Sequence, residues 1–279
     1  MDFAGEALFA TVKSAEPLPK DASEVYVKVN QRDDKGTGDY TAYDYTLEYE
    51  RGITDSFTVA GSLKGMSLDT SGLLIEGYLP KEKKFDFKTT GFEIEAAYNF
   101  LKPALDDFGL SASVAFDYGW IDPHSGQDKT TINVELGLQL QKYFMDGQLI
   151  WGGNINLETT WADRSKIDNL PADFEWPTDP EMEIELSYST GLSYRFAPKW
   201  FIGIEAQYQE EYETEVNRER WSWFAGPSLH YATKNYWVNA TWLEQFRGGG
   251  ESYDDQPDQD LHLIEKTKTE LLVQVGYNF

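Results

Sequence analysis

The chain has 279 residues, with 48 Asp and Glu against 24 Lys and Arg, which gives a formal net charge of −24 at pH 7. So acidic a chain is not a nucleic-acid binder, and the absence of cysteine excludes disulfides and thiolate chemistry. No apolar run approaches the ~18 residues of a spanning helix, which excludes a helical membrane protein but leaves a transmembrane β-barrel open.

Apolar and polar residues alternate in segments separated by turn residues, and no stretch shows helical periodicity of useful length. The alternation predicts twelve strands, at residues 24–31, 40–51, 55–64, 90–100, 108–120, 130–143, 148–162, 181–196, 199–211, 219–231, 235–247 and 263–279. An even number suits a barrel with both termini in the periplasm. Fourteen strands would result if residues 65–89 contain a further hairpin.

The connections between these strands alternate in length. Short ones are expected at 52–54, 101–107, 144–147, 197–198 and 232–234, and long ones, rich in Asp, Glu, Gly and Pro, at 32–39, 65–89, 121–129, 163–180, 212–218 and 248–262. Short periplasmic turns with long extracellular loops are the layout of transmembrane barrels. The loop at 65–89, which contains Leu73, Leu74 and Ile75, is the candidate for a constriction folded into the mouth.

Each predicted strand has one apolar face. Strand 130–143, for example, places Ile132, Val134, Leu136, Leu138 and Leu140 on one side. A membrane barrel would turn this face towards lipid, whereas a β-sandwich would bury it as core. The last strand favours the barrel, because its apolar face ends on the aromatic pair Tyr277 and Phe279, which suits a membrane–water interface. From residue 270 onwards, Leu272 is the one apolar residue on the other face of this strand.

The aromatic residues fall into two groups along the predicted strands. Trp151, Trp200, Tyr236, Tyr277 and Phe279 lie near short-turn ends, and Tyr43, Trp120, Trp161 and Trp221 near long-loop ends. Two such levels predict the two aromatic girdles of a membrane barrel.

Residues 195–206, 223–231, 237–245 and 276–279 resemble segments of a family of uncharacterised proteobacterial outer-membrane barrels. The chain is also similar, more loosely, to transporter barrels encoded beside aromatic-degradation genes. The resemblance covers most of the chain and implies a barrel in the outer membrane of a Gram-negative bacterium. The family has no assigned activity, so the resemblance implies no substrate and no catalytic residues.

We expect two parts in the chain, an N-terminal segment at 1–21 and the barrel at 22–279. The segment could be a periplasmic tail or could be tucked into the lumen, where Phe3, Leu8 and Phe9 could anchor a plug. The pattern does not choose between the two.

Strand parity predicts which charges line the lumen. An acidic wall is expected from Glu48, Glu95, Glu135, Glu158, Glu185 and Glu205, and a basic wall from Arg220, Arg247, Lys266 and Lys268, with Arg195 as a basic exception on the acidic side. Carboxylates outnumber cations, which predicts a modest cation preference. Alternatively, opposite charges pair across a narrow lumen and close it. Small inward residues favour an opening: Gly137, Gly152, Gly191, Gly203 and Gly226.

Few residues suit catalysis or metal binding. Of the three histidines, His124 and His262 are expected in solvent, while His230 shares the lumen side of one strand with Ser228. A Ser–His pair could serve an outer-membrane lipid hydrolase, but no orienting group or oxyanion hole is recognisable nearby. The acidic loop at 254–260 could bind Ca²⁺ weakly, although a solvated loop is the simpler interpretation.

We therefore predict a monomeric outer-membrane channel for passive diffusion of small hydrophilic, cationic solutes, with no catalytic residue, metal or cofactor. Its partners would be outer-membrane lipid, lipopolysaccharide and small solutes or ions, and not nucleic acid. The alternatives are a closed structural or adhesive barrel that acts through its loops, a lipid hydrolase using Ser228 and His230, and an uptake barrel for apolar aromatics, which the polar lumen disfavours.

Overall fold

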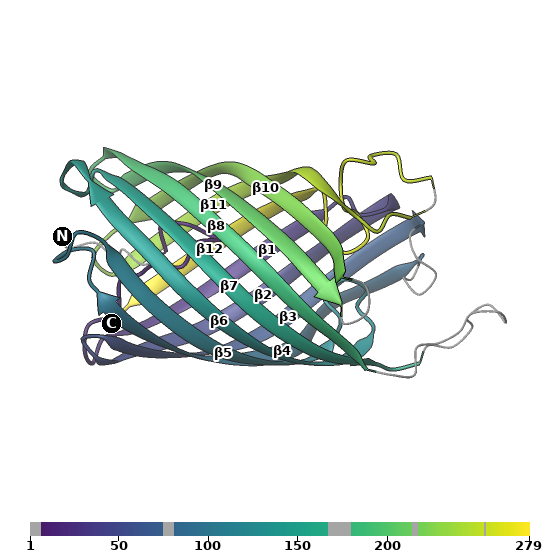
Figure 1. Ribbon diagram of the computed structural model, residues 1–279, viewed down its shortest axis with the longest axis horizontal. Helices are drawn as coiled ribbons and strands as arrows, with labels where there is room; N and C mark the ends of the chain where they lie inside the picture. The colour runs from purple at the N-terminus through teal and green to yellow at the C-terminus, as the bar shows by residue number, and fades with distance from the viewer. Residues whose placement is uncertain (1–6, 75–80, 167–179, 214–216, 254) are drawn as a thin grey trace.

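The alternating segments form strands that pair antiparallel around a closed ring (Figure 1). The computed structural model describes residues 7–74, 81–166, 180–213, 217–253 and 255–279. Over these residues there are twelve strands and one short 3-10 turn, η1 (Met145–Gly147). The strands are β1 (Ser23–Asp33), β2 (Thr37–Thr54), β3 (Phe57–Leu74), β4 (Lys83–Leu101), β5 (Gly109–Ile121), β6 (Asp128–Phe144), β7 (Leu149–Arg164), β8 (Glu181–Ala197), β9 (Trp200–Glu213), β10 (Asn217–Ala232), β11 (Tyr236–Gly250) and β12 (Thr269–Asn278).

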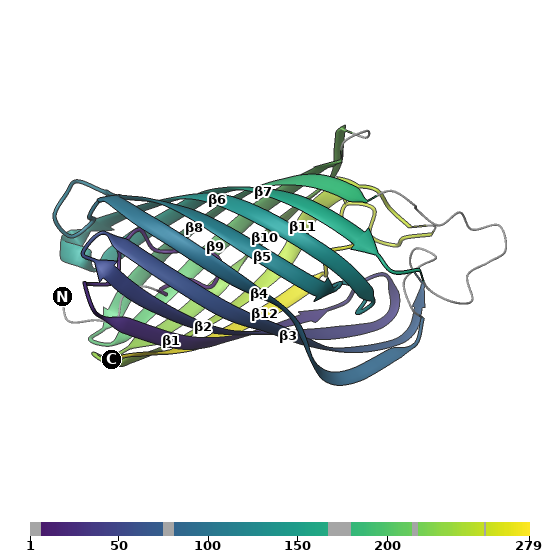
Figure 2. The same ribbon diagram turned by 90° about the horizontal axis from the view of Figure 1, so that it is seen from below.

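Each strand pairs with its neighbours in sequence, and β1 pairs with β12 to close the barrel. The predicted antiparallel barrel of twelve strands is confirmed, and the fourteen-strand alternative is wrong. The short turns and the C-terminus lie at one end of the barrel (Figures 1 and 2). The connections at the other end include the one at 251–268, but the predicted long loop at 32–39 is wrong, because only residues 34–36 separate β1 from β2. No helix within the described residues is long and apolar enough to span a membrane.

Several predicted strand boundaries are wrong, and two of the differences are large. Most of the expected loop at 65–89 is strand, because β3 runs to Leu74 and β4 begins at Lys83. Leu73 is therefore buried beside the strand-borne Met66 and Leu68 rather than in a mouth loop, and Ile75 lies outside the described residues. The last strand begins at Thr269 and not at residue 263, because residues 263–268 turn inward to pack in the barrel mouth.

The outer surface of the barrel is apolar, as the predicted lipid-facing side requires. On β6, Leu136 and Leu138 are 53% and 44% exposed, whereas Gln139 and Gln141 on the opposite face are 2% and 3% exposed. A sandwich would bury the leucines and expose the glutamines. The inverted arrangement is stable only where lipid replaces water around the wall.

Aromatic side chains are exposed at both ends of this apolar belt. Trp200, Tyr236, Tyr277 and Phe279 are exposed at the short-turn end, and Trp120 at the other. Rings at these levels suit the two membrane–water interfaces.

The N-terminal segment enters the barrel from the short-turn end, where Figure 2 shows it inside the ring of strands. Leu8, Phe9 and Val12 are buried against Ile150 and Phe201, which belong to the inner faces of β7 and β9. Of the two placements left open for this segment, the described residues occupy the lumen.

Candidate functional site

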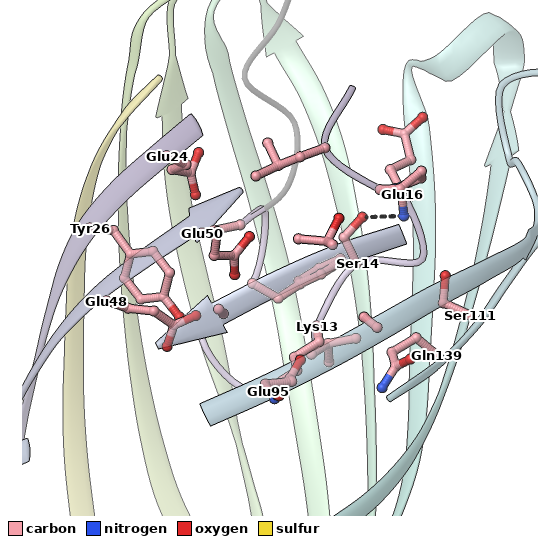
Figure 3. A pocket seen from close by; sticks show the side chains of 18 of the residues that line it. Lys13, Ser14, Glu16, Glu24, Tyr26, Glu48, Glu50, Glu95, Ser111 and Gln139 are labelled. Carbon is pink, nitrogen blue, oxygen red and sulfur yellow. Dashed lines mark hydrogen bonds and ion pairs between the residues drawn. The ribbon is translucent and has the colours of Figure 1, made fainter. Parts of the chain in front are cut away.

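The polar interior of the barrel holds two cavities. The periplasmic cavity, of about 160 Å³, lies between the N-terminal segment and the inner faces of β1 to β4 (Figure 3). The extracellular cavity, of about 310 Å³, lies towards the long connections and is lined by residues of β2 to β9 and of the connections, among them eight carboxylates and three lysines. What can cross the barrel therefore depends on the segments that close off these two spaces.

Glu205 on β9 holds the N-terminal segment from inside the wall. Its fully buried carboxylate accepts hydrogen bonds from the backbone N–H groups of Ala10 at 3.0 Å and Thr11 at 2.9 Å, and from the Thr11 hydroxyl at 2.7 Å. Thr241 donates a further bond at 2.6 Å. Because a hydrogen bond to a charged group contributes about 1.5–3 kcal/mol, this one carboxylate is a strong anchor.

Polar side chains on other strands bind the segment's backbone at Lys13 and Ala15. Asn154 accepts from the Lys13 N–H at 2.6 Å and donates to the Lys13 carbonyl at 2.9 Å. Asn99 and Ser111 donate to the Ala15 carbonyl at 2.6 and 2.9 Å. Residues from four different strands thus bind an irregular chain that could not otherwise be buried.

Small residues on the wall make room for the segment. A Cβ added to Gly191 would lie 2.5 Å from the Phe9 ring, and one added to Gly152 would lie 3.0 Å from Val12. These two glycines were expected to favour an opening, but they accommodate the plug instead. Ala10 packs on the other side of the lumen against Phe224, Leu243 and Leu272, which accounts for the apolar Leu272 on an otherwise polar face.

The connection at 251–268, called here the arm, closes part of the extracellular mouth. Its buried core contains Tyr253, Leu261, Leu263 and Ile264. Gln245 on β11 fixes the arm by accepting from the His262 N–H at 2.7 Å and donating to the His262 carbonyl at 3.0 Å. His262 is fully buried, so the prediction that it is exposed to solvent is wrong.

Arg220 on β10 joins the arm to the acidic wall. Its guanidinium lies 3.0 Å from Glu265 of the arm, contacts Glu211 on β9, and lies 3.3 Å from Glu219. Only 6% of its side chain is exposed, so these carboxylates depend on it for charge compensation.

We predict that Arg220→Met lowers stability by about 3–5 kcal/mol, because removal of one partner leaves uncompensated buried charges. Chemical unfolding of the refolded barrel in detergent measures the change. Arg218→Met is the matched control, since the Arg218 side chain is 51% exposed and lies 3.9 Å from its carboxylate partner. Equal stability of the two variants would contradict this role of Arg220.

Acid should release the arm. Burial would raise the pKa of Glu265, but Arg220, His124 and Lys35 outweigh burial and lower it from 4.5 to about 2. A carboxyl with a lowered pKa contributes stability above pH 4.5 that is lost as the pH falls towards 2. Burial also lowers the pKa of His262 from 6.5 to about 3. The buried, neutral imidazole therefore loses stability relative to the released arm as the pH falls from 6.5 towards 3.

The measurement is hydrogen exchange of residues 261–266 at pH 7 and pH 3, corrected for the intrinsic exchange rates. We expect protection of the arm to fall at pH 3 while the amides of β6 and β7 stay protected. Unchanged protection of the arm would contradict the assignment of its packing to Glu265 and His262.

The predicted acidic residues divide between the two cavities. Glu48 and Glu95 line the periplasmic cavity, and Glu158 and Glu185 line the extracellular one. Glu135 pairs in register with Glu158, and so lies on the same inner face. Glu205 binds the N-terminal segment.

The predicted basic wall is only partly present. Lys266 lines the extracellular cavity, where its Nζ is 3.4 Å from Glu185, and Arg220 contacts two other lining residues, Glu211 and Glu265. Lys268 belongs to the arm and pairs with Asp258 at 3.2 Å, since the strand begins one residue later. Arg195 lies two residues after the lumen-facing Ser193, on the same face of β8 and near the short-turn end of the strand.

Arg247 does not face the lumen. A bulge between β10 and β11 pairs Arg247 with the exposed Trp223 and Gln245 with the buried Phe224, which leaves Phe246 unpaired. An extra residue in one strand reverses the facing of the residues beyond it, and strict alternation could not foresee this.

Several cations inside the lumen were missed. Lys64 on β3 contacts Glu93 and Asp117, both at 2.7 Å, and shares the inward parity of Ser62 that could have revealed it. Lys13, which contacts Glu95, lies on the N-terminal segment, where no strand parity applies.

Ser228 and His230 do not form a catalytic pair. His230 is buried with its ring 5.6 Å from that of Phe201 and 6.3 Å from that of Trp237. Neither ring nitrogen has a side-chain hydrogen-bond partner within the described part of the chain, so Ser228 lacks an activating base. The described residues also contain no cluster of three or more ligands that could hold a metal ion.

A closed antiparallel barrel with an apolar belt, aromatic interfaces and a polar interior defines an outer-membrane β-barrel protein of a Gram-negative bacterium. A family model described as "Family of unknown function (DUF6662)" matches residues 1–279, and the chain belongs to this family. The predicted membership in an uncharacterised outer-membrane barrel family is thereby confirmed. No curated protein matches the chain.

Solved outer-membrane barrels have a similar fold. The COG4313 outer membrane channel from Pseudomonas putida F1 is 12% identical, with 95% of this chain and 98% of that one covered and a TM-score of 0.60. The beta domain of the Bordetella autotransporter BrkA is 11% identical, with coverages of 93% and 100% and a TM-score of 0.58. The NanC porin is 10% identical, with coverages of 91% and 98% and a TM-score of 0.51. At these identities the likeness concerns the fold.

Proposed function

We propose that this protein is an outer-membrane channel for passive diffusion of small hydrophilic solutes with a preference for cations. The observation that carries the proposal is the lining of the extracellular cavity, which includes Asp117, Glu158, Glu183 and Glu211 and has more carboxylates than cations. A narrow charged lining selects solutes by charge. Two barrels of similar fold, the COG4313 outer membrane channel and the NanC porin, support this class of function.

The N-terminal segment is the constriction of the proposed channel. Hydrogen bonds and small apolar contacts hold it against the wall, and the chain has no cysteine that could cross-link it there, so thermal motion can displace it. Passage would then proceed by diffusion from the extracellular cavity past the segment to the periplasmic cavity, with the barrel working as a monomer in lipid and lipopolysaccharide.

Single-channel conductance of the refolded protein in a planar bilayer tests the proposal, with the reversal potential measured under a salt gradient. Steady conductance with a cation-selective reversal potential is expected. A silent bilayer, with insertion shown by heat-modifiable gel mobility, would reject the channel.

A closed barrel that acts through its loops is the second candidate. The observation in its favour is that both the N-terminal segment and the arm are buried within the barrel. Silence in the bilayer would favour this candidate and direct experiments towards binding by the extracellular connections.

A further inference from the structure

The strand register places many acidic residues of the lumen in one row of paired positions. Residues directly opposite in successive strands are Glu24, Glu50, Ala60, Glu95, Ala115, Glu135, Glu158, Glu185 and Glu211, from β1 to β9. Seven of the nine are glutamates. Opposite residues in an antiparallel pair have Cβ atoms about 4.5–5.5 Å apart, so the carboxylates from Glu135 to Glu211 lie within reach of their neighbours, whereas an alanine separates Glu95 from the glutamate on either side.

A second row runs beside the first, two residues further along each strand. It contains Glu48, Ser62, Glu93, Asp117, Asn133, Thr160, Glu183 and Glu213. We call the acidic residues of the two rows the carboxylate band. Because the strands tilt in a barrel, the band climbs from Glu24 at the short-turn end to Glu211 and Glu213 at the extracellular end.

Lysine ammonium groups already occupy the band at three heights. Lys13 contacts Glu95, Lys64 lies 2.7 Å from both Glu93 and Asp117, and Lys266 lies 3.4 Å from Glu185. These cations come from the N-terminal segment, from a strand and from the arm. The band therefore binds ammonium groups that reach it from three different parts of the structure.

The periplasmic cavity adds a second sign of an ammonium site. Four side-chain oxygens without a hydrogen-bond partner among the described residues line it, all on residues at most 9% exposed: Thr58 Oγ1, Asn99 Oδ1, Gln139 Oε1 and Gln274 Oε1. Figure 3 shows Glu24, Glu48 and Glu50 together at one side of this cavity, with Lys13 beside Glu95 next to them and Ser111 and Gln139 on the other side. Buried acceptors beside carboxylates match the three donors of an ammonium group.

We propose that the carboxylate band binds solutes with primary ammonium groups, and that the Lys13 ammonium is an intramolecular occupant of its periplasmic end. The inference deepens the proposed function by naming the class of cation. The band is extended and its carboxylates do not converge into a metal-binding cluster within the described residues, which suits a linear polyamine better than a metal ion.

The test is calorimetric titration of the full-length refolded protein with spermidine in detergent. Removal of the internal competitor by Lys13→Gln should tighten binding about tenfold. Lys20→Gln is the matched control, because Lys20 lies in the same segment but beside the turn at Asp55, and not among the residues that line the periplasmic cavity. The double variant Glu95→Gln/Glu135→Gln should weaken binding by tenfold or more, and Asp107→Asn in an exposed turn should leave it unchanged.

Tetramethylammonium separates an ammonium site from simple charge attraction, because it carries a positive charge but no N–H donor. We expect it not to compete with spermidine. Equal spermidine affinity in all variants, or full competition by tetramethylammonium, would overturn the inference. Either result would mean that spermidine binds by general attraction to the negative charge of the protein.

The two proposals fail in different ways. A silent bilayer with variant-dependent spermidine binding rejects the channel and supports the ammonium-binding band. A conducting barrel whose spermidine binding ignores the band variants supports the channel and overturns the band. Heat-modifiable mobility of each variant verifies that it has folded.

Discussion

Substitution of Glu205 by Gln should raise the mean single-channel conductance several-fold. The Glu205 carboxylate accepts hydrogen bonds from the Ala10 N–H, the Thr11 N–H and the Thr11 hydroxyl. In the Gln variant an NH₂ group replaces one of the two carboxylate oxygens. This group is a donor and cannot accept the hydrogen bonds that the oxygen accepted. Loss of one or two such bonds costs about 1.5–3 kcal/mol each. Since each 1.4 kcal/mol is about a factor of ten in an equilibrium, the displaced state of the N-terminal segment would become much more populated.

Two measurements check this expectation. Planar-bilayer recordings report the conductance, and limited trypsin digestion at Lys13 reports exposure of the segment. Glu210→Gln is the matched control, since Glu210 lies on the same strand but accepts from Tyr208 on the outer side at 2.8 Å. If trypsin cleaves the Glu205 variant faster while the conductance stays the same, the segment is not the constriction.

The barrel wall was predictable from sequence because lipid on one side and a polar lumen on the other require apolar and polar residues to alternate along each strand. Leu136 and Leu138 face lipid while Gln139 and Gln141 face the lumen, and this alternation is legible in consecutive residues. Burial inside the lumen follows no such rule. Ala10 and Glu205 are 195 residues apart in sequence, and no local sequence pattern near either residue predicts their hydrogen bond.

Some signals of the plug were nevertheless present. Leu272 was an isolated apolar residue on a polar face, and Phe224 and Leu243 share that inner surface. Three apolar side chains in a polar lumen predict an apolar partner, which proved to be Ala10. The arm at 251–268 was missed for the opposite reason, because Leu263 fits strand alternation but packs with Tyr253 and Leu261 in a cluster of its own.

Neutralising the centre of the carboxylate band should remove most of the cation preference. Glu135, Glu158 and Glu185 are directly opposite one another on β6, β7 and β8. Three like charges in neighbouring register positions attract cations into a narrow lumen and repel anions, and Gln keeps their size while removing the charge. The triple variant should therefore show a reversal potential near zero under a salt gradient at unchanged or lower conductance.

Lys64→Gln should shift the reversal potential the other way, because it removes the cation that lies 2.7 Å from Glu93 and from Asp117. Asp107→Asn, in an exposed turn outside the lumen, is the control for a change in total charge. All the shifts should shrink at 1 M salt, where charges are screened beyond about 3 Å. If the triple variant and the Asp107 variant change selectivity equally, the preference comes from the net charge of the protein and not from the band.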